Sequence, residues 1–182
     1  HFLMSDWLGL SGRTAVITGA GGGIGKAIAL ELAANGVNCN VLDRASDIVD
    51  ATVAQISQSG GKATGHICDV TDEAGIKSVA NSITSCDVLV NAAGLVRPGA
   101  LADLTTSEWD DLLKVNLTGY FLMAIEFTPH LVASGNGSMI HIASISSTNP
   151  QGSSGAYSVS KAGVVIMSKQ LAFELGSKGV RS

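Results

Sequence analysis

Short runs of apolar residues alternate along this chain with longer segments in which apolar residues recur at helical spacing. The pattern predicts strands at 13–18, 37–42, 62–67, 87–90 and 138–142, and helices at 23–35, 46–59, 71–84, from about 106 onward and at about 154–177. Strand–helix alternation of this kind gives a parallel sheet with right-handed crossovers and helices on both faces. We therefore predict an α/β fold with a doubly wound parallel sheet.

Local signals refine the predicted helix ends. The segment Thr105-Thr-Ser-Glu108 is a capping-box pattern, in which a hydroxyl and a carboxylate satisfy backbone N–H groups at the start of a helix. Proline lacks a backbone N–H, so we expect Pro129 to bend or end the long helix that begins near Thr106. No linker, internal repeat or low-complexity stretch interrupts the pattern, which favours a single domain over residues 1–182.

The composition limits the kinds of function. The 182 residues are 46% hydrophobic and 14% charged, which is typical of a chain with a large buried core. The net charge is −4, and lysine and arginine occur at most in isolated pairs, so we expect no nucleic-acid partner. No apolar run approaches the roughly 18 residues that a membrane span needs, so we expect no membrane partner.

The N-terminal segment and the cysteines fit a cytoplasmic protein. Residues 1–4 lack the basic start and the apolar core of a signal peptide, and we interpret them as left over from cloning. The cysteines, Cys39, Cys68 and Cys86, are odd in number and lack the spacing of metal ligands. We therefore expect reduced, buried thiols and no metal site.

A glycine-rich segment, Thr18-Gly-Ala-Gly-Gly-Gly-Ile-Gly25, joins the first predicted strand to the first predicted helix. Here Gly19, Gly23 and Gly25 would let the backbone turn tightly and approach a pyrophosphate, whose charge is favoured by the helix N-terminus. The spacing is GxxxGxG rather than GxGxxG, and an ordinary glycine-rich turn is the alternative. The strand–loop–helix context favours a nucleotide site.

Asp43 ends the second predicted strand, where a carboxylate can accept hydrogen bonds from the adenosine ribose hydroxyls. It would also repel a 2′-phosphate, because two unit charges ~4 Å apart interact by about 4 kcal/mol at an effective dielectric near 20. This favours NAD over NADP. Arg44 points the other way, since a guanidinium could pair with the phosphate. An aspartate that caps the next helix is the alternative role for Asp43.

Tyr157 and Lys161 are spaced i, i+4, so on a helix they share one face and the ammonium can lie near the phenol oxygen. A free tyrosine needs about 4 kcal/mol of stabilisation to act as a base near pH 7, and one positive charge at ~4 Å supplies about that much. A surface tyrosine beside a solvated lysine is the alternative. Ser144 follows a predicted strand, where its hydroxyl could bond a substrate oxygen.

Ser146 and Ser147 compete with Ser144 for that role, and turn formation is the other explanation for any serine in this loop.

These motifs, in this order, resemble the classical short-chain dehydrogenase/reductase family over residues 9 to 181. The family pattern TGxxxGIG matches Thr18 to Gly25, and its NNAG tetrad matches Asn91-Ala-Ala-Gly94 with alanine at the second position.

The resemblance implies a dinucleotide-binding domain of the Rossmann type and assigns roles to further residues. Asp69-Val70 matches the acidic pair that touches the adenine ring in the family, and Asn116 matches the asparagine that holds a water in the proton relay. The implied cofactor-binding residues are Gly19, Gly23, Ile24, Gly25, Asp43, Arg44, Asp69, Val70, Asn91, Ala92, Gly94, Tyr157 and Lys161.

The implied reaction is hydride transfer between NAD(H) and a secondary alcohol or ketone. Tyr157 would be the general acid or base, Lys161 would favour its ionised form and hold the nicotinamide ribose, and Ser144 would orient the carbonyl. Asn116 would connect Lys161 to solvent through water. Family members form dimers or tetramers through their two long helices, so we expect a homodimer or homotetramer.

The chain departs from the family at its C-terminal end. Family members continue with a further strand, a Pro-Gly loop, a substrate lid and a final strand, and Gly179-Val-Arg181 resembles the start of the first of these. We therefore expect the C-terminal strands to be missing from this sequence, either because a tail lies outside it or because the protein is truncated and impaired.

Other functions stay open at this point. A truncated, non-catalytic dinucleotide-binding module is the alternative from another class. Among enzymes, the chain resembles 3-oxoacyl-carrier-protein reductases and sugar or polyol dehydrogenases. Asp43 fits the reductases poorly, because those usually take NADP. A nucleotide-sugar epimerase is a more distant alternative, since those relatives prefer GxxGxxG spacing.

Overall fold

The computed structural model describes residues 6–182, so the interpretation of residues 1–4 lies outside the described residues. Within residues 6–182, six strands form one parallel sheet in the order β3-β2-β1-β4-β5-β6. The strand order reverses between β1 and β4, as in a doubly wound sheet, so the predicted fold is confirmed. The strands are β1 (Thr14–Thr18), β2 (Asn38–Asp43), β3 (Lys62–Ile67), β4 (Val88–Asn91), β5 (Gly137–His141) and β6 (Val180–Arg181).

The predicted helices and strands agree with the observed ones to within two residues at the ends that were predicted. The helices are α1 (Gly23–Ala34), α2 (Ser46–Gln58), α3 (Glu73–Ser82), α4 (Thr106–Leu113), α5 (Gly119–Ala133) and α6 (Gly155–Leu175). The expected long helix is divided into α4 and α5 by a turn of π-helix at Lys114–Thr118.

Pro129 neither ends the helix nor divides it. It lies inside α5, which continues to Ala133, whereas the irregular turn lies earlier, at Lys114–Thr118. Both Pro129 and Ile125, the residue four positions earlier, are exposed, so water can satisfy the Ile125 carbonyl that a proline leaves without an N–H donor. The expectation that Pro129 ends the helix is therefore wrong.

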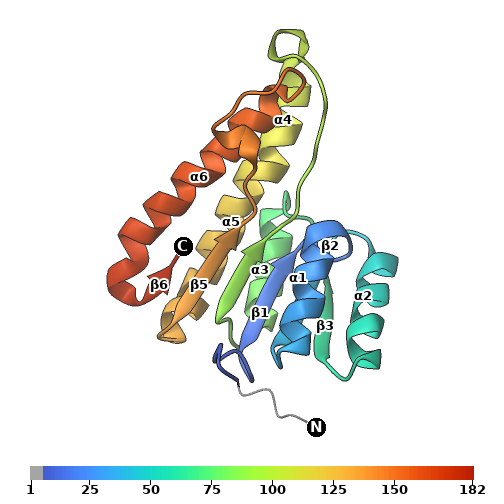
Figure 1. Ribbon diagram of the computed structural model, residues 1–182, viewed down its shortest axis with the longest axis vertical. Helices are drawn as coiled ribbons and strands as arrows, with labels where there is room; N and C mark the ends of the chain where they lie inside the picture. The colour runs from blue at the N-terminus through green and yellow to red at the C-terminus, as the bar shows by residue number, and fades with distance from the viewer. Residues whose placement is uncertain (1–5) are drawn as a thin grey trace.

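The sheet carries a separate apolar core on each face. Helices α1 and α2 pack on one face, and α3, α5 and α6 pack on the other; in Figure 1, α1 lies in front of the sheet and α3 behind it. Neighbouring residues of β1 point into different cores, since Ala15 and Ile17 belong to the first and Val16 to the second. All three cysteines are buried and free, as predicted.

The strand predicted at Gly179-Val-Arg181 is present as β6, where Val180 pairs with Gly137 and Arg181 with Ser138 of β5. The structure ends in this edge strand, beside α6 (Figure 1). Among residues 6–182, no helix combines the length and the apolar character needed to cross a membrane.

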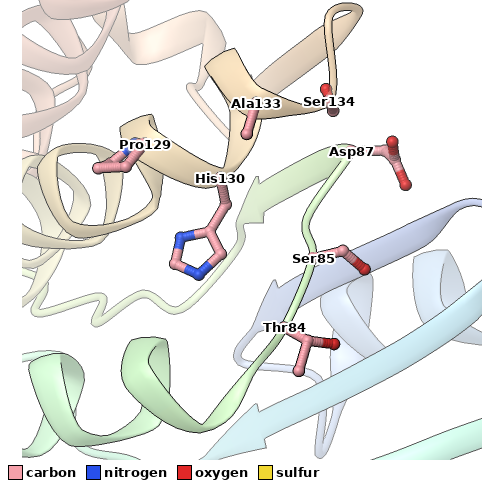
Figure 2. Close-up of a pocket in the computed structure, with 7 residues that line it drawn as sticks. All are labelled: Thr84, Ser85, Asp87, Pro129, His130, Ala133 and Ser134. Atoms are coloured by element: carbon pink, nitrogen blue, oxygen red, sulfur yellow. The ribbon is translucent and has the colours of Figure 1, made fainter.

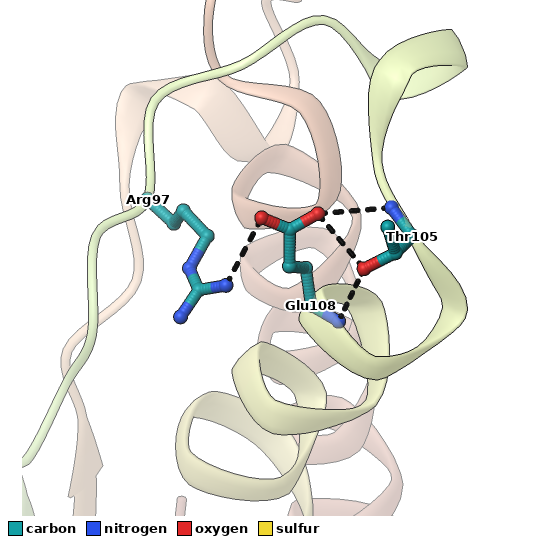
Figure 3. Close-up of polar contacts among 3 residues, drawn as sticks. All are labelled: Arg97, Thr105 and Glu108. Atoms are coloured by element: carbon teal, nitrogen blue, oxygen red, sulfur yellow. Dashed lines mark hydrogen bonds and ion pairs between the residues drawn. The ribbon is translucent and has the colours of Figure 1, made fainter.

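A small polar cluster ties the loop after β4 to the start of α4. The Thr105 hydroxyl accepts a hydrogen bond from the Glu108 N–H at 3.2 Å, and the Glu108 carboxylate accepts one from the Thr105 N–H at 2.9 Å, which confirms the capping box. The other carboxylate oxygen pairs with Arg97 at 3.3 Å (Figure 3). The hydrogen bonds from Thr105 and the Arg97 charge lower the pKa of Glu108.

Candidate active site

The glycine loop joins β1 to α1 in a shape that only glycine allows at two positions. Gly19 has φ +64°, and a Cβ there would lie 2.7 Å from the Ala93 backbone. At Gly25 a Cβ would lie 2.4 Å from the Gly19 carbonyl oxygen. Both distances are too short for any side chain, so the loop packs directly against the segment that follows β4 and against the first turn of α1.

The first turn of α1 has no side-chain cap. Its N-cap is Gly22, which offers no hydrogen-bonding side chain to the free N–H groups of the turn, and Ile24 is exposed. Uncapped N–H groups at a helix start attract anions, since they and the helix dipole both favour negative charge. The loop therefore has the backbone that a pyrophosphate requires.

Asp43, at the end of β2, lies against this loop. One carboxylate oxygen accepts a hydrogen bond from the Gly21 N–H at 3.1 Å, and the other accepts one from the Arg44 N–H at 2.8 Å. The alternative role as a helix cap is excluded, because the N-cap of α2 is Ala45 and no side chain caps it. Asp43 therefore braces the glycine loop at the place where the ribose of a bound dinucleotide is predicted.

Asp69 and Val70 follow β3 at the same edge of the sheet. The Asp69 carboxylate accepts hydrogen bonds from the Thr71 N–H and hydroxyl, both at 2.8 Å. These bonds lower the pKa of Asp69, and the charges of Arg44 and Lys114 lower it further. Val70 is buried against the start of α5. The structure thus brings Asp43, Arg44 and Asp69 to neighbouring strand ends.

Asn91 and the residues after it pack against the end of β1 and the start of the glycine loop. The Thr18 hydroxyl accepts hydrogen bonds from the N–H groups of Ala92 and Ala93 at 3.1 and 3.2 Å, which ties the end of β1 to the end of β4. Asn91 is fully buried and donates to the Tyr120 carbonyl at 3.1 Å. Its side chain therefore connects β4 to α5 and points into the protein.

Asn116 lies in the π-helical turn between α4 and α5, and π-turns often mark functional sites. Its side chain is fully buried: the amide oxygen accepts from the Leu95 N–H at 2.7 Å, and the amide nitrogen donates to the Leu95 carbonyl at 2.8 Å and to the Ser160 hydroxyl at 3.2 Å. Ser160 in turn donates to the Tyr157 carbonyl at 2.7 Å. Asn116 thus links the loop after β4 to α6.

Tyr157 and Lys161 both lie in α6, about one turn apart. The Lys161 ammonium is 5.8 Å from the centroid of the Tyr157 ring. It donates hydrogen bonds to the Ile142 carbonyl at 2.6 Å and to the Tyr120 hydroxyl at 3.2 Å. Burial lowers the pKa of Lys161 to about 8. A buried lysine with a lowered pKa, beside a tyrosine, is typical of acid–base sites.

Ser144 follows β5 and is half-buried. Its hydroxyl accepts a hydrogen bond from the Ser146 N–H at 3.2 Å, and its N–H donates to the Ser147 hydroxyl at 3.3 Å. The serine loop therefore includes the turn bonds that the alternative explanation predicts. Ser146 is buried, so it is a weaker rival for contact with a substrate.

Four polar residues near the site were not predicted as site residues: Thr18, Tyr120, His141 and Ser160. Their contacts join segments far apart in the sequence, so the sequence does not show those contacts directly. Some signal is present all the same: Thr18 starts the glycine-rich motif, Ser160 lies between Tyr157 and Lys161, and Tyr120 follows Asn116 by four residues and so shares its helix face. His141 stacks on Tyr120, with the ring centroids 6.0 Å apart, and burial lowers its pKa to about 4.

A cavity lies away from all of these residues. It has a volume of about 420 Å³ and is lined by Thr84, Ser85, Asp87, Pro129, His130, Ala133 and Ser134, at the opposite, amino edge of the sheet (Figure 2). A second cavity of about 200 Å³ lies between β5 and α6 and includes His141. Among the described residues, no group of three or more His, Cys, Asp or Glu side chains could hold a metal ion.

Comparison with known proteins gives one consistent result. The sequence profile of the family described as short chain dehydrogenase matches residues 13–182. D-threitol dehydrogenase of Mycolicibacterium smegmatis is 36% identical, over 94% of this chain and 68% of its own length. The 3-oxoacyl-[acyl-carrier-protein] reductase of Thermotoga maritima is 33% identical, over 94% of this chain and 72% of its own length.

Solved structures of dehydrogenases have the same fold as this chain. A 7α-hydroxysteroid dehydrogenase complexed with NADH and 7-oxo glycochenodeoxycholic acid superimposes with a TM-score of 0.92 at 32% identity, covering 97% of this chain and 71% of that chain. A protein of Beutenbergia cavernae described as an NAD(P)-dependent gluconate 5-dehydrogenase, with NADP bound at low occupancy, superimposes with a TM-score of 0.89 at 35% identity, covering 94% of this chain and 70% of that chain. This chain therefore spans about 70% of the length of these relatives.

Proposed function

Because this chain belongs to the short-chain dehydrogenase family, we propose that it transfers a hydride between NAD(H) and a secondary alcohol or ketone. The observation that carries the proposal is the buried Lys161, whose pKa is lowered to about 8 and whose ammonium lies 5.8 Å from the ring of Tyr157. Such a cation can stabilise a phenolate, which lets the phenol exchange a proton with a substrate oxygen.

The residues present fit a dinucleotide. Gly19 and Gly25 allow the tight turn of the loop, because a Cβ at either position would strike the backbone of Ala93 or Gly19. Nothing lies within 4 Å of a Cβ built at Gly22 or Gly23, and the first turn of α1 is uncapped, so the start of the helix is open to an anion. A bound nicotinamide supplies or accepts the hydride. The role of the protein's own groups is to hold the pyrophosphate on the loop, to bond the ribose through Asp43, and to order the adenine side through Asp69 and Val70.

Four side chains divide the proton chemistry. Tyr157 gives a proton to the carbonyl oxygen in reduction and takes it back in oxidation. Lys161 stabilises the ionised phenol and bonds the nicotinamide ribose, and the Ser144 hydroxyl orients the substrate oxygen. Asn116 is buried between Leu95 and Ser160. We expect it to hold a water molecule through which protons pass between Lys161 and the solvent.

The preference for NAD is tested at Asp43. Replacing it by asparagine removes the charge but keeps an oxygen that can accept the Gly21 N–H. We expect the ratio of NADH to NADPH affinity to fall by about tenfold, or about 1.4 kcal/mol, because repulsion of the 2′-phosphate is lost. Arg44→Gln is the counterpart, and weaker NADPH binding in it would show that the guanidinium pairs with the phosphate. An unchanged ratio in Asp43→Asn would contradict the assignment.

Exposed apolar side chains on α5 and α6 support a homo-oligomer. Phe121 and Ile125 on α5, and Val159, Ile166 and Phe173 on α6, are all exposed. Exposed apolar residues gathered on two helices are typical of protein–protein interfaces. A dimer or tetramer in sedimentation, converted to monomer by Phe173→Ser or Phe121→Ser, would support this assembly.

A second candidate is a non-catalytic dinucleotide-binding module, because the glycine loop and the uncapped first turn of α1 would support binding without any proton chemistry at Tyr157. One experiment separates the two. The 182-residue chain is titrated with NADH to measure binding, and then mixed with NADH and a panel of ketones while nicotinamide absorbance is followed. Turnover supports the enzyme, and saturable NADH binding without turnover supports the module.

A further inference from the structure

Lys161 is held by a second phenol that the proposed mechanism does not use. Its ammonium donates to the Tyr120 hydroxyl at 3.2 Å and to the Ile142 carbonyl at 2.6 Å, and the hydroxyl itself donates to that carbonyl at 3.4 Å. The three groups therefore form a closed triangle just beyond β5. The ammonium is also nearer to the Tyr120 ring centroid, at 4.8 Å, than to that of Tyr157, at 5.8 Å.

Tyr120 is buried and is held by two neighbouring side chains, Asn91 and His141. The side chain is 1% exposed. Its carbonyl accepts a hydrogen bond from the Asn91 amide at 3.1 Å, and the same amide lies 3.1 Å from His141 Nδ1. The His141 ring stacks on the Tyr120 ring with an interplanar angle of 28°. A hydroxyl on such a rigid support is a preorganised acceptor, so it can select one position of the Lys161 side chain.

No anion balances the buried ammonium. Within residues 6–182 the ion pair that forms joins Arg97 to Glu108, and no carboxylate pairs with Lys161. The titratable groups around Lys161 are Tyr157 on its own helix, Tyr120 on α5 and His141 on β5. Burial raises the pKa of Tyr120 and lowers that of His141 to about 4, so both are neutral near pH 7. Neutral acceptors must therefore stabilise the cation.

We propose that Tyr120 is a positioning residue, whose hydroxyl holds the Lys161 ammonium beyond β5 and favours its protonated form. The catalytic consequence rests on the proposed function, because the reaction at Tyr157 depends on that positive charge. The contact itself does not depend on turnover. The two ideas can therefore fail separately.

The test measures the ionisation of Lys161 directly. Protein labelled with ¹³C at the lysine side chains is titrated by NMR, and Lys161→Met identifies the Lys161 signal. In Tyr120→Phe we expect the pKa of Lys161 to fall by about one unit, because a buried cation loses one of its acceptors. Phe121→Leu, the exposed neighbour on α5, is the matched control and should leave the pKa unchanged. An unchanged pKa in Tyr120→Phe overturns the proposal.

The pH profile of turnover gives the catalytic readout. The limb of kcat that follows the Lys161 charge should shift downward in Tyr120→Phe by the same amount as the NMR titration. If the unmutated chain shows no turnover, the proposed function fails while the NMR titration still decides the role of Tyr120. If the pKa of Lys161 falls but the limb of kcat stays, the contact stands and its catalytic consequence is overturned.

A second measurement covers the case in which Tyr120→Phe does not fold. The chain has two tyrosines, so in Tyr157→Phe the only phenol is Tyr120. With 3-fluorotyrosine at that position, the ¹⁹F signal should change with a midpoint near the pKa of Lys161, about 8, without ionisation of the phenol. The change should vanish when Lys161→Met is added. A ¹⁹F signal that is the same with and without Lys161→Met would contradict the hydrogen bond between Lys161 and Tyr120.

Discussion

The carboxyl edge of the sheet carries the glycine loop, Asp43 and the Tyr157–Lys161 pair, whereas the amino edge carries the larger cavity, beneath the end of α5 (Figure 2). Three polar side chains of the amino edge make structural hydrogen bonds, although His130 Nδ1 is buried without a partner among the described residues. Asp87 accepts from the Thr14 N–H at 2.7 Å, Ser134 donates to the Leu131 carbonyl at 2.8 Å, and His130 Nε2 bonds the Ile83 carbonyl at 3.0 Å.

The carboxyl edge carries polar groups that are not engaged in structural bonds. The first turn of α1 has no side-chain cap, and Lys161 keeps a buried positive charge without a carboxylate partner in the described part of the chain. In a parallel sheet all strands end at this edge, so side chains from several strands and loops converge there. Cavity volume alone therefore points to the amino edge, whereas the state of the polar groups points to the carboxyl edge.

The largest expected effect is at Tyr157. Tyr157→Phe keeps the ring but removes the proton donor, so we expect kcat to fall by roughly 10³-fold, within the range for loss of a general acid or base. NADH affinity should stay nearly unchanged, because the glycine loop is intact. Stopped-flow turnover and NADH titration measure the two quantities. Turnover in Tyr157→Phe equal to that of the unmutated chain would contradict the assignment of the active site to the carboxyl edge.

The next effect is a pH dependence of stability that comes from His141, below the same edge. Its pKa is about 4 in the folded chain and 6.5 when exposed, so the unfolded state binds more protons between these values. Stability from this group is complete above pH 6.5 and is lost as the pH falls toward 4. The gap corresponds to about 3 kcal/mol.

Urea unfolding at pH 7 and pH 4.5 measures this loss. His141→Gln should lose much less stability than the unmutated chain over the same interval, since glutamine does not titrate. His66, whose pKa burial also lowers, leaves a smaller slope in both proteins. The same slope in both would mean that His141 is not buried in its neutral form.

A smaller effect is expected from the glycine loop. In Gly19→Ala the new Cβ would lie 2.7 Å from the Ala93 backbone at a φ of +64°, so we expect a loss of about 2 kcal/mol in stability and weaker NADH binding. Gly22→Ala is the matched control, because φ is −157° and no atom lies within 4 Å of its Cβ. Similar NADH affinity in the two variants would contradict the role of the loop.

The fold could be predicted from the sequence because it depends on local periodicity, and the strand at 62–67 was placed without error. Pro129 shows the limit of local rules. A proline is expected to end a helix because it removes one N–H donor, but the energetic cost depends on whether water can reach the Ile125 carbonyl that loses this donor, and the sequence does not show that. The π-turn at Lys114–Thr118 lies inside a continuous helical pattern, so no residue type in it marks the change.

The candidate site divides in the same way. The backbone-defined parts, such as Gly19 and Gly25, follow from a motif whose geometry is local. The partners of Lys161 do not, because Tyr120 and Ile142 reach it from other elements, 41 and 19 residues away in sequence. The sequence predicts that Lys161 shares a helix face with Tyr157, but the acceptors that hold its ammonium emerge only from the packing of α5, β5 and α6.

The smallest expected effect is at the amino edge. It tests whether the cavity there takes part in the reaction. Asp87→Asn removes the charge in the 420 Å³ cavity while an amide oxygen can still accept the Thr14 N–H. Since a neutral acceptor replaces a charged one, we expect a loss of about 1 kcal/mol in stability and a change of less than about twofold in kcat and NADH affinity. Ser134→Ala, at another residue that lines the cavity, should have similarly small effects. If either variant reduced turnover as strongly as Ser144→Ala, the larger cavity would belong to the reaction, and the state of the polar groups would be a poor guide to the site.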